Sequence, residues 1–150
     1  MSHAGEKVLR DVRADDLNAF FEHQREPAAN EMAIFPARDR ETFDAHWQRI
    51  LADDSVTART IVHEGEPAGN IGCWQQDGQR LVGYWIGREF WGKGLATRAL
   101  REFVEEVPAR PLHAWVATSN VGSIRVLEKC GFVQVSARRT DVPELLFQLG

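Results

Sequence analysis

GREFWGKGLAT, residues 87–97, joins an apolar run to a segment with helical spacing through two glycines that flank a lysine. A glycine-rich turn at the start of a helix offers an anion free backbone N–H groups and the positive end of the helix dipole. Glycine at positions 92 and 94 also allows close approach of a ligand to the backbone. We therefore predict a phosphate- or pyrophosphate-binding turn, where Lys93 either adds a positive charge or points to solvent.

The turn is one residue short of the pattern G-x-x-x-x-G-K-[ST], which binds ATP or GTP. Gly87, Gly92 and Lys93 fit this pattern, but Gly94 stands where a hydroxyl must hold Mg²⁺. No apolar strand downstream ends in a suitably placed acidic Mg²⁺ ligand. An ATP or GTP site is disfavoured, and a turn that only packs a helix against a strand remains a structural alternative.

Strand and helix patterns alternate on both sides of this turn. Short apolar runs predict strands at 7–12, 58–65, 67–78, 79–87, 112–118, 132–137 and 144–149. Apolar residues at helical spacing predict helices at 15–26, 39–54, 93–107 and 120–131. This order predicts an α/β (α+β) fold, a mixed and mostly antiparallel sheet of about seven strands with helices on both faces.

The helix ends carry recognisable capping residues. We expect a carboxylate from Asp15 or Asp16 to cap the first helix. The last helix is expected to begin at a cap from Ser119 or Asn120 and to end at Gly131 in the left-handed conformation.

Length and composition limit the possible classes of protein. The 150 residues suit one domain over 1–150, with 43% hydrophobic and 27% charged residues. We expect no membrane span and no signal peptide, hence a cytoplasmic protein. The net charge of −4 argues against nucleic-acid binding. The two cysteines lack a C-x-x-C partner and the five histidines lack ligand spacing, so we expect reduced thiols and no metal site.

Two motifs together resemble the GCN5-related N-acetyltransferase (GNAT) superfamily. WGKGLA fills the family pattern [Q/R]-x-x-G-x-[G/A], and NVGSIRVLEKCGF matches its later block of an asparagine, a small residue and a final GF. The resemblance covers nearly the whole chain and implies the GNAT fold, with the sheet splayed between strands four and five. Trp91 departs from the usual Gln or Arg, and Leu127 replaces the tyrosine that protonates the leaving thiolate in many members. These features are most similar to the ribosomal-protein N-terminal acetyltransferase (Rim-type) branch, which does not fix the acceptor.

The resemblance implies acetyl-CoA as the co-substrate, and no metal. Its pyrophosphate would lie on the N–H groups between Gly92 and Thr97, and its pantetheine arm would pair with the backbone at Ile86 and Arg88. An N–H near Trp85 or Ile86 would polarise the thioester carbonyl. The expected cofactor contacts are Trp85, Ile86, Gly87, Arg88, Trp91, Gly92, Lys93, Gly94, Leu95, Ala96, Thr97, Asn120 and Ser123.

The resemblance also suggests catalytic residues. Ser123 would hydrogen-bond or protonate the CoA sulfur, and Asn120 would hold the pantetheine amide or sulfur. Purely structural roles, as a first-turn serine and a helix cap, stay open for both. Tyr84 is either an acid or a core residue. The predicted acceptor-binding residues are Glu31, Trp74 and Tyr84. No general base is identified among Glu26, Glu31, Asp77 and His113.

These features predict an N-acetyltransferase that moves an acetyl group from acetyl-CoA to a primary amine by direct attack in a ternary complex. The amine is that of a protein N-terminus or of a small molecule. The alternative is a catalytically silent module that senses acyl-CoA. The expected partners are acetyl-CoA and the amine acceptor, with no nucleic acid or membrane, and a homodimer is possible.

Overall fold

The structure is a computed structural model that describes residues 7–25, 39–139 and 141–150. The elements in chain order are β1 (Leu9–Asp11), α1 (Asp16–Gln24), α3 (Arg40–Ala52), β2 (Thr57–His63), β3 (Glu66–Gln76), β4 (Gln79–Ile86), the 3₁₀ turn η1 (Arg88–Phe90), α4 (Leu95–Glu106), β5 (Leu112–Ala117), α5 (Val121–Lys129), β6 (Val133–Arg139) and β7 (Pro143–Leu149). The order agrees with the sequence prediction, although β1 is shorter than expected.

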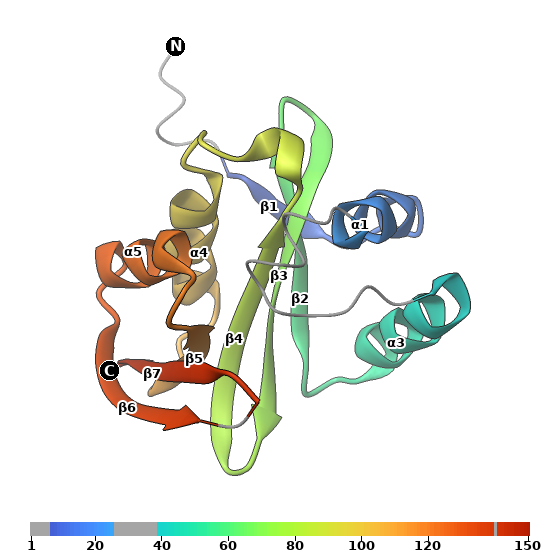
Figure 1. Cartoon of the computed structure of the whole chain (residues 1–150). Helices are drawn as coiled ribbons and strands as arrows, with labels where there is room; N and C mark the ends of the chain where they lie inside the picture. The colour runs from blue at the N-terminus through green and yellow to red at the C-terminus, as the bar shows by residue number, and fades with distance from the viewer. Residues whose placement is uncertain (1–6, 26–38, 140) are drawn as a thin grey trace.

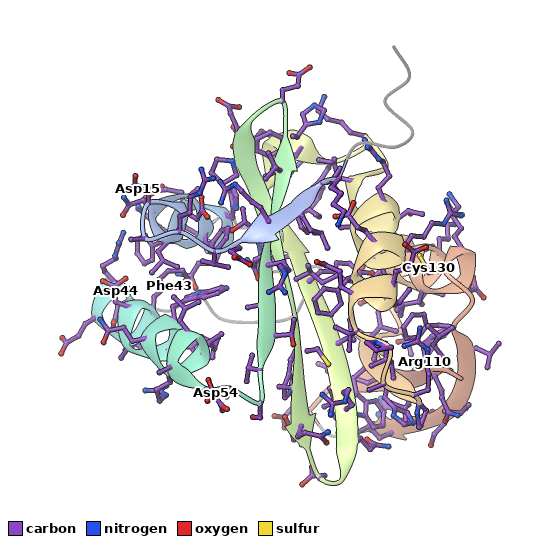
Figure 2. All side chains as sticks on the ribbon, turned by 180° about the vertical axis from the view of Figure 1, so that it is seen from behind. Asp15, Phe43, Asp44, Asp54, Arg110 and Cys130 are labelled. Atoms are coloured by element: carbon purple, nitrogen blue, oxygen red, sulfur yellow. The ribbon has the colours of Figure 1, made fainter. Side chains whose placement is uncertain are left out.

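Within the described residues, the strands form one seven-stranded sheet in the order β1-β2-β3-β4-β5-β7-β6. Neighbouring strands are antiparallel except β4 and β5, which are parallel. Figure 1 shows α1 and α3 on one face of the sheet and α4 and α5 on the other, and the reverse view in Figure 2 shows the same two layers. The predicted mixed, mostly antiparallel sheet with helices on both faces is confirmed.

Two apolar clusters hold these layers together. Helix α4 turns Leu95, Ala99, Leu100 and Phe103 toward the interior, because these residues recur at helical spacing on one face. Most of this face joins the main core between α4, α5 and the sheet. A smaller aromatic cluster of Phe20, Phe43 and Trp47 joins α1 to α3 on the opposite side. The sheet is thus covered by helices on both faces.

The packing is interrupted between β4 and β5. These strands pair at Leu81 and His113 alone, and then diverge. The predicted splay between strands four and five is therefore present. The end of β4, residues 82–86, is left without a strand partner on that side, so its backbone remains open to a ligand.

Asp16 corrects the capping prediction for the first helix. The residue before the helix, Asp15, makes no side-chain capping bond. Asp16 is instead 3% exposed and binds both guanidinium nitrogens of Arg10, at 2.6 and 2.9 Å. It also accepts hydrogen bonds from the backbone N–H of Arg13 and the hydroxyl of Thr60, both at 2.8 Å. Asp16 therefore fixes α1 to β1 and β2, which sequence spacing could not indicate.

The other two capping predictions are confirmed. The side-chain oxygen of Asn120 accepts a hydrogen bond from the backbone N–H of Ser123 at the start of α5. Gly131 follows α5 with a φ of 91°, in the left-handed region. Both capping signals depend only on neighbouring residues, which is why the sequence alone was sufficient to predict them.

None of the helices in the described part of the chain is long and apolar enough to cross a membrane.

Replacing Asp16 with asparagine is expected to lower the free energy of unfolding by about 2–4 kcal/mol near neutral pH, because Arg10 loses its buried partner. Burial raises the pKa of Asp16, but its hydrogen bonds outweigh burial and hold that pKa below its ordinary value. The stabilisation is therefore complete above the unfolded pKa of about 4 and is lost as the pH falls toward the folded pKa.

Urea unfolding of both proteins, from about pH 7 down to about pH 3, measures this difference. The two unfolding free energies should converge at the acid end. Asp15→Asn, at an exposed position, is the matched control and should change little. A difference that stays constant over the whole pH range would show that the charge of Asp16 is not what stabilises α1.

Candidate functional site

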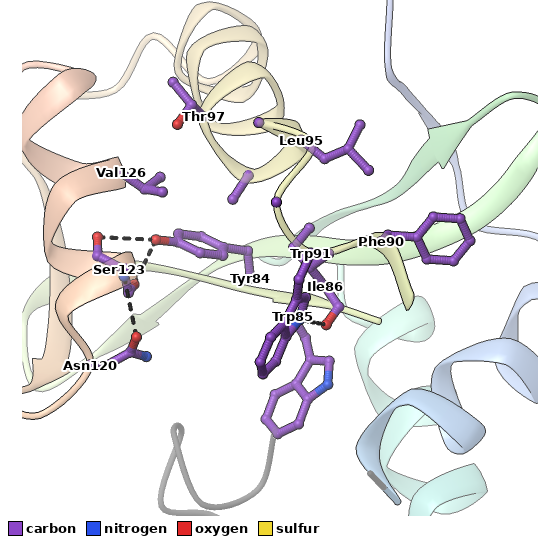
Figure 3. A pocket seen from close by; sticks show the side chains of 14 residues that line it. Tyr84, Trp85, Ile86, Phe90, Trp91, Leu95, Thr97, Asn120, Ser123 and Val126 are labelled. Atoms are coloured by element: carbon purple, nitrogen blue, oxygen red, sulfur yellow. Dashed lines mark hydrogen bonds between the residues drawn. The ribbon is translucent and has the colours of Figure 1, made fainter. Parts of the chain in front are cut away.

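A cavity of about 340 Å³ lies between the end of β4, the turn that precedes α4 and the first turns of α4 and α5. Figure 3 shows its lining side chains. They are Tyr84, Trp85, Ile86, Phe90, Trp91, Gly92, Gly94, Leu95, Ala96, Thr97, Asn120, Gly122, Ser123 and Val126. Most of the predicted cofactor residues are thus brought together around one space. Gly87, Arg88 and Lys93 do not line it.

The glycine turn has the conformation that an anion site needs. Gly92 and Gly94 have φ values of 79° and 74°, and helix α4 begins directly afterwards at Leu95. A Cβ at either glycine would meet nothing within 4 Å. Glycine is therefore required by the left-handed backbone conformation and not by a lack of space for a side chain. The first turn of α4 contains no acidic residue. Its backbone N–H groups can therefore receive an anion without repulsion.

Trp91, which departs from the usual family residue, fastens this turn to β4. Its indole N–H donates to the carbonyl oxygen of Ile86 at 2.9 Å. The guanidinium of Arg88 lies over the indole, 4.6 Å from the ring centroid. Arg88 is therefore stacked on the turn rather than directed into the cavity. The Ile86 carbonyl already accepts one bond, which leaves its second lone pair for a ligand.

Tyr84 and Ser123 form the closest polar pair in the cavity. Their hydroxyl oxygens are 2.6 Å apart, and the Tyr84 oxygen also lies 3.4 Å from the carbonyl oxygen of Ser123. Figure 3 shows the tyrosine ring reaching across from β4 to α5. Leu127, at the position where many family members have tyrosine, is 1% exposed in the main core. The cavity thus contains a tyrosine hydroxyl supplied by a different element.

Burial raises the pKa of Tyr84 to about 12, although the hydrogen bond to Ser123 opposes this effect. The phenol therefore keeps its proton at neutral pH. A protonated Tyr84 can donate to the oxygen of Ser123, which frees the hydrogen of Ser123 to point elsewhere. The pair can hydrogen-bond a group that develops negative charge in the cavity.

A second cavity, of about 640 Å³, lies on the α1 and α3 side of β3 and β4. It shares Tyr84 and Trp85 with the first cavity. Its lining residues are Phe20, Gln24, Phe43, His46, Trp47, Ile50, Val56, Ala58, Asn70, Ile71, Gly72, Trp74, Gln76, Gly83, Tyr84 and Trp85. Trp74 and Tyr84, two predicted acceptor residues, therefore lie here. The third, Glu31, lies outside the described residues, as does Glu26.

Comparison with known proteins agrees with this geometry. The family model described as "Acetyltransferase (GNAT) domain" matches residues 8–133 of this chain. This chain belongs to the GNAT family. Bacillus subtilis (strain 168) YdaF, which has the provisional name of a ribosomal N-acetyltransferase, is 31% identical over 107 residues. The match covers 67% of this chain and 58% of YdaF, so the chain spans less than two thirds of that relative.

Solved GNAT structures share the fold. The aminoglycoside acetyltransferase AAC(6')-Ib in complex with coenzyme A is 23% identical, with a TM-score of 0.78 over 95% of this chain and 93% of that one. Spermidine N-acetyltransferase from Vibrio cholerae, in complex with CoA and spermine, is 13% identical, with a TM-score of 0.83 over 94% and 93%. At these identities the likeness establishes the fold alone.

His23 packs against Gly87 and Trp85 beside the first cavity, a contact that the sequence analysis missed. It lies in the last turn of α1 and is 6% exposed. A Cβ at Gly87 would stand only 2.6 Å from its Cδ2 atom and 2.7 Å from its Nε2 atom. The backbone carbonyl of His23 also accepts a hydrogen bond from the indole N–H of Trp85 at 3.4 Å. Gly87 is therefore required because the imidazole of His23 occupies the space that any side chain would need.

Burial lowers the pKa of His23, with a smaller opposing effect from Glu22, so the imidazole is neutral near pH 7. Its Nδ1 atom has no hydrogen-bond partner in the described part of the chain. No signal in the sequence linked His23 to Gly87, because the two residues belong to separate elements and meet only through packing.

Two of the suggested bases line neither cavity. His113 is buried in β5 with its Nε2 atom 3.1 Å from the side-chain oxygen of Gln148. Asp77 is in the turn between β3 and β4, with a φ of 53°. Among the described residues, no group of three or more His, Cys, Asp or Glu side chains could hold a metal ion.

Gly87→Ala is expected to lower the free energy of unfolding by about 1–3 kcal/mol, because the new methyl group displaces the His23 ring. Adding His23→Ala should remove that clash, so the double variant should lose less stability than the sum of the two single changes. Gly122→Ala is the matched control, since a Cβ there meets nothing within 4 Å. Thermal or urea unfolding of the four proteins measures the coupling. Strictly additive losses would rule out the His23 contact as the reason for glycine.

Proposed function

We propose that this chain is an N-acetyltransferase that transfers an acetyl group from acetyl-CoA to a primary amine. The observation that carries the proposal is the Tyr84–Ser123 hydroxyl pair, which faces the same cavity as the glycine turn. One end of the cavity suits a pyrophosphate, and the other offers hydrogen bonds to a leaving thiolate. Family membership and the CoA complexes of structural neighbours support the same co-substrate.

The residues of the cavity fit acetyl-CoA, which when bound supplies an activated acetyl carbonyl on a thiol leaving group. The N–H groups from Gly92 to Thr97 would hold the pyrophosphate, and the unpaired end of β4 would align the pantetheine arm. Amine attack forms a carbon–nitrogen bond and breaks the carbon–sulfur bond. The amine loses one proton, and the thiolate is released or takes one up.

Ser123 would stabilise the departing sulfur, and Tyr84 would position Ser123. Because Tyr84 retains its proton well above neutral pH, it can donate this hydrogen bond to the serine oxygen. The serine hydrogen is then directed toward the sulfur. Asn120 orients the same turn by accepting from the backbone N–H of Ser123 at 3.2 Å. Its cap and its proposed contact to the pantetheine arm are compatible, since a side-chain amide has separate donor and acceptor ends.

The acceptor amine must reach the acetyl carbon as a neutral base, because an alkyl ammonium has a pKa of about 10. The second cavity reaches β4 from the opposite face and shares Tyr84 and Trp85 with the first. We propose that the amine enters from there. A protein N-terminus and a small amine both remain candidate acceptors. A single domain over 1–150, a cytoplasmic location and a possible homodimer also remain predictions.

Acetyl-CoA binding is tested by calorimetry on the parent protein, Gly94→Asp and Gly94→Asn. Both variants place a side chain of nearly equal size at a residue with a φ of 74°, so they share the same backbone strain. Only aspartate adds negative charge beside the pyrophosphate, and we expect it to bind acetyl-CoA at least about tenfold more weakly than asparagine does. No binding by the parent would refute the co-substrate. Equal acetyl-CoA binding by the two variants would show that the pyrophosphate binds elsewhere than at this turn.

Catalysis is tested by steady-state rates of thiol release. Ser123→Ala should lower kcat about 10- to 100-fold, the effect of a hydrogen bond to a charged group. Tyr84→Phe should lower kcat about three- to tenfold, because the serine remains but is less well oriented. The acetyl-CoA dissociation constant should stay nearly constant in both. Val121→Ala, at an exposed position in the same turn of α5, is the control. A parent that binds acetyl-CoA but acetylates no amine would favour a silent sensor.

A further inference from the structure

The floor of the second cavity contains two glycines that face each other across the sheet. Gly72 of β3 and Gly83 of β4 are direct partners in the strand register. A Cβ at Gly72 would meet only the backbone oxygen of Thr57, at 3.4 Å, and would otherwise enter open space. Neither glycine has a positive φ. Neither glycine is therefore needed for an unusual backbone turn. Gly72 leaves open space over the sheet, and Gly83 leaves room for the ring of Trp74.

Aromatic rings surround the open space over Gly72. The indole of Trp74 lies across Gly83, where a Cβ would be 3.0 Å from its Cη2 atom. The opposite wall contains Phe20 and Trp47, with ring centroids 5.0 Å apart. Phe43 continues this wall, 6.4 Å from Trp47. A ligand group above Gly72 would therefore lie between aromatic faces from the sheet and from the helices.

The described lining residues of this cavity include one histidine, His46, and no Asp, Glu, Lys or Arg. The remaining polar groups are the side-chain amides of Gln24, Asn70 and Gln76. The indole N–H of Trp74 is bound to the side-chain oxygen of Gln76 at 3.1 Å. A ligand with several positive charges would lose its hydration here without a described carboxylate to replace it.

We propose that the acceptor is an aryl-alkyl primary amine, whose ring lies over Gly72 while its amino group reaches past Trp85 toward Tyr84. This inference rests on the proposed acetyltransferase function and specifies its acceptor. The volume of about 640 Å³ is in the range that encloses a drug-sized ligand. In the reaction, the aryl-alkyl amine gains the acetyl group on nitrogen and loses one proton, and CoA leaves as thiol or thiolate.

Acceptor preference is measured as kcat/KM for a fixed set of amines with saturating acetyl-CoA. The set contains 2-phenylethylamine, ethylamine, spermidine and two short peptides that begin with Phe or Gly. Burial of the ring should make 2-phenylethylamine about 10- to 100-fold better than ethylamine, and should favour it over spermidine. Comparing 2-phenylethylamine with the Phe peptide tells whether the ring belongs to a small molecule or to a protein N-terminus.

The binding position is tested by Gly72→Val, which fills the floor with a residue that strands accept readily. We expect kcat/KM for 2-phenylethylamine to fall more than about tenfold while the acetyl-CoA dissociation constant stays the same. Gly72→Ala adds a smaller side chain and should give a smaller loss of kcat/KM. It provides a second measurement if valine at this position disturbs folding. Ser136→Val on the exposed strand β6 is the control for adding the same side chain elsewhere in the sheet.

The outcomes separate the two proposals. Transfer to spermidine, ethylamine or the Gly peptide at rates equal to or above those for the aromatic amines would overturn the aromatic acceptor but leave the acetyltransferase intact. So would a preference for aromatic amines that Gly72→Val and Gly72→Ala leave unchanged, since the ring would then bind elsewhere. Acetyl-CoA binding with no transfer to any of these amines would overturn the aromatic acceptor, and only a failure with every primary amine offered would overturn the acetyltransferase as well.

Discussion

The divergence of β4 from β5 is the constraint on which the rest of the site depends. The strands are held together at Leu81 and His113 and then separate. Had they remained paired, the backbone at the end of β4 would be fully bonded, and α5 could not bring Ser123 to Tyr84. The two strands can diverge without losing their place in the sheet because each is hydrogen-bonded on its other side, β4 to β3 and β5 to β7. The main core beneath, which α4 and α5 fill, supports both halves of the sheet.

Side-chain alternation along β4 explains how two cavities share this one strand. Successive residues of a strand point to opposite faces. Tyr84 points toward α5, where it meets Ser123, and Trp85 points toward α1, where its indole donates to His23. The acetyl donor and the acceptor can therefore approach from the two sides of the sheet. In the proposed reaction, a single strand would then position both, which is the proximity that direct transfer requires.

The Tyr84–Ser123 pair also shows that a chemical role is not tied to one position in the chain. Leu127 is buried in the core where a tyrosine is frequent in the family, yet a tyrosine hydroxyl lies 2.6 Å from the serine hydroxyl. The phenol comes from the sheet instead of from the helix. Since its pKa is raised by burial, it serves better as a fixed hydrogen-bond donor than as a source of protons. This difference is why the proposed contact with the CoA sulfur falls to Ser123.

The sequence by itself determined the features that depend on neighbouring residues. Strand and helix order follows from apolar spacing, the glycine turn from backbone freedom at Gly92 and Gly94, and the α5 cap from Asn120. Family membership also followed from two local motifs. Tertiary structure alone decided that Asp16 anchors α1 instead of capping it, that His23 fills the space beside Gly87, and that Gly72 faces Gly83. The same holds for Tyr84, since both faces of β4 are apolar in sequence and either could have been the core. These contacts join separate elements, so they depend on strand register and helix packing, which no short stretch of sequence specifies.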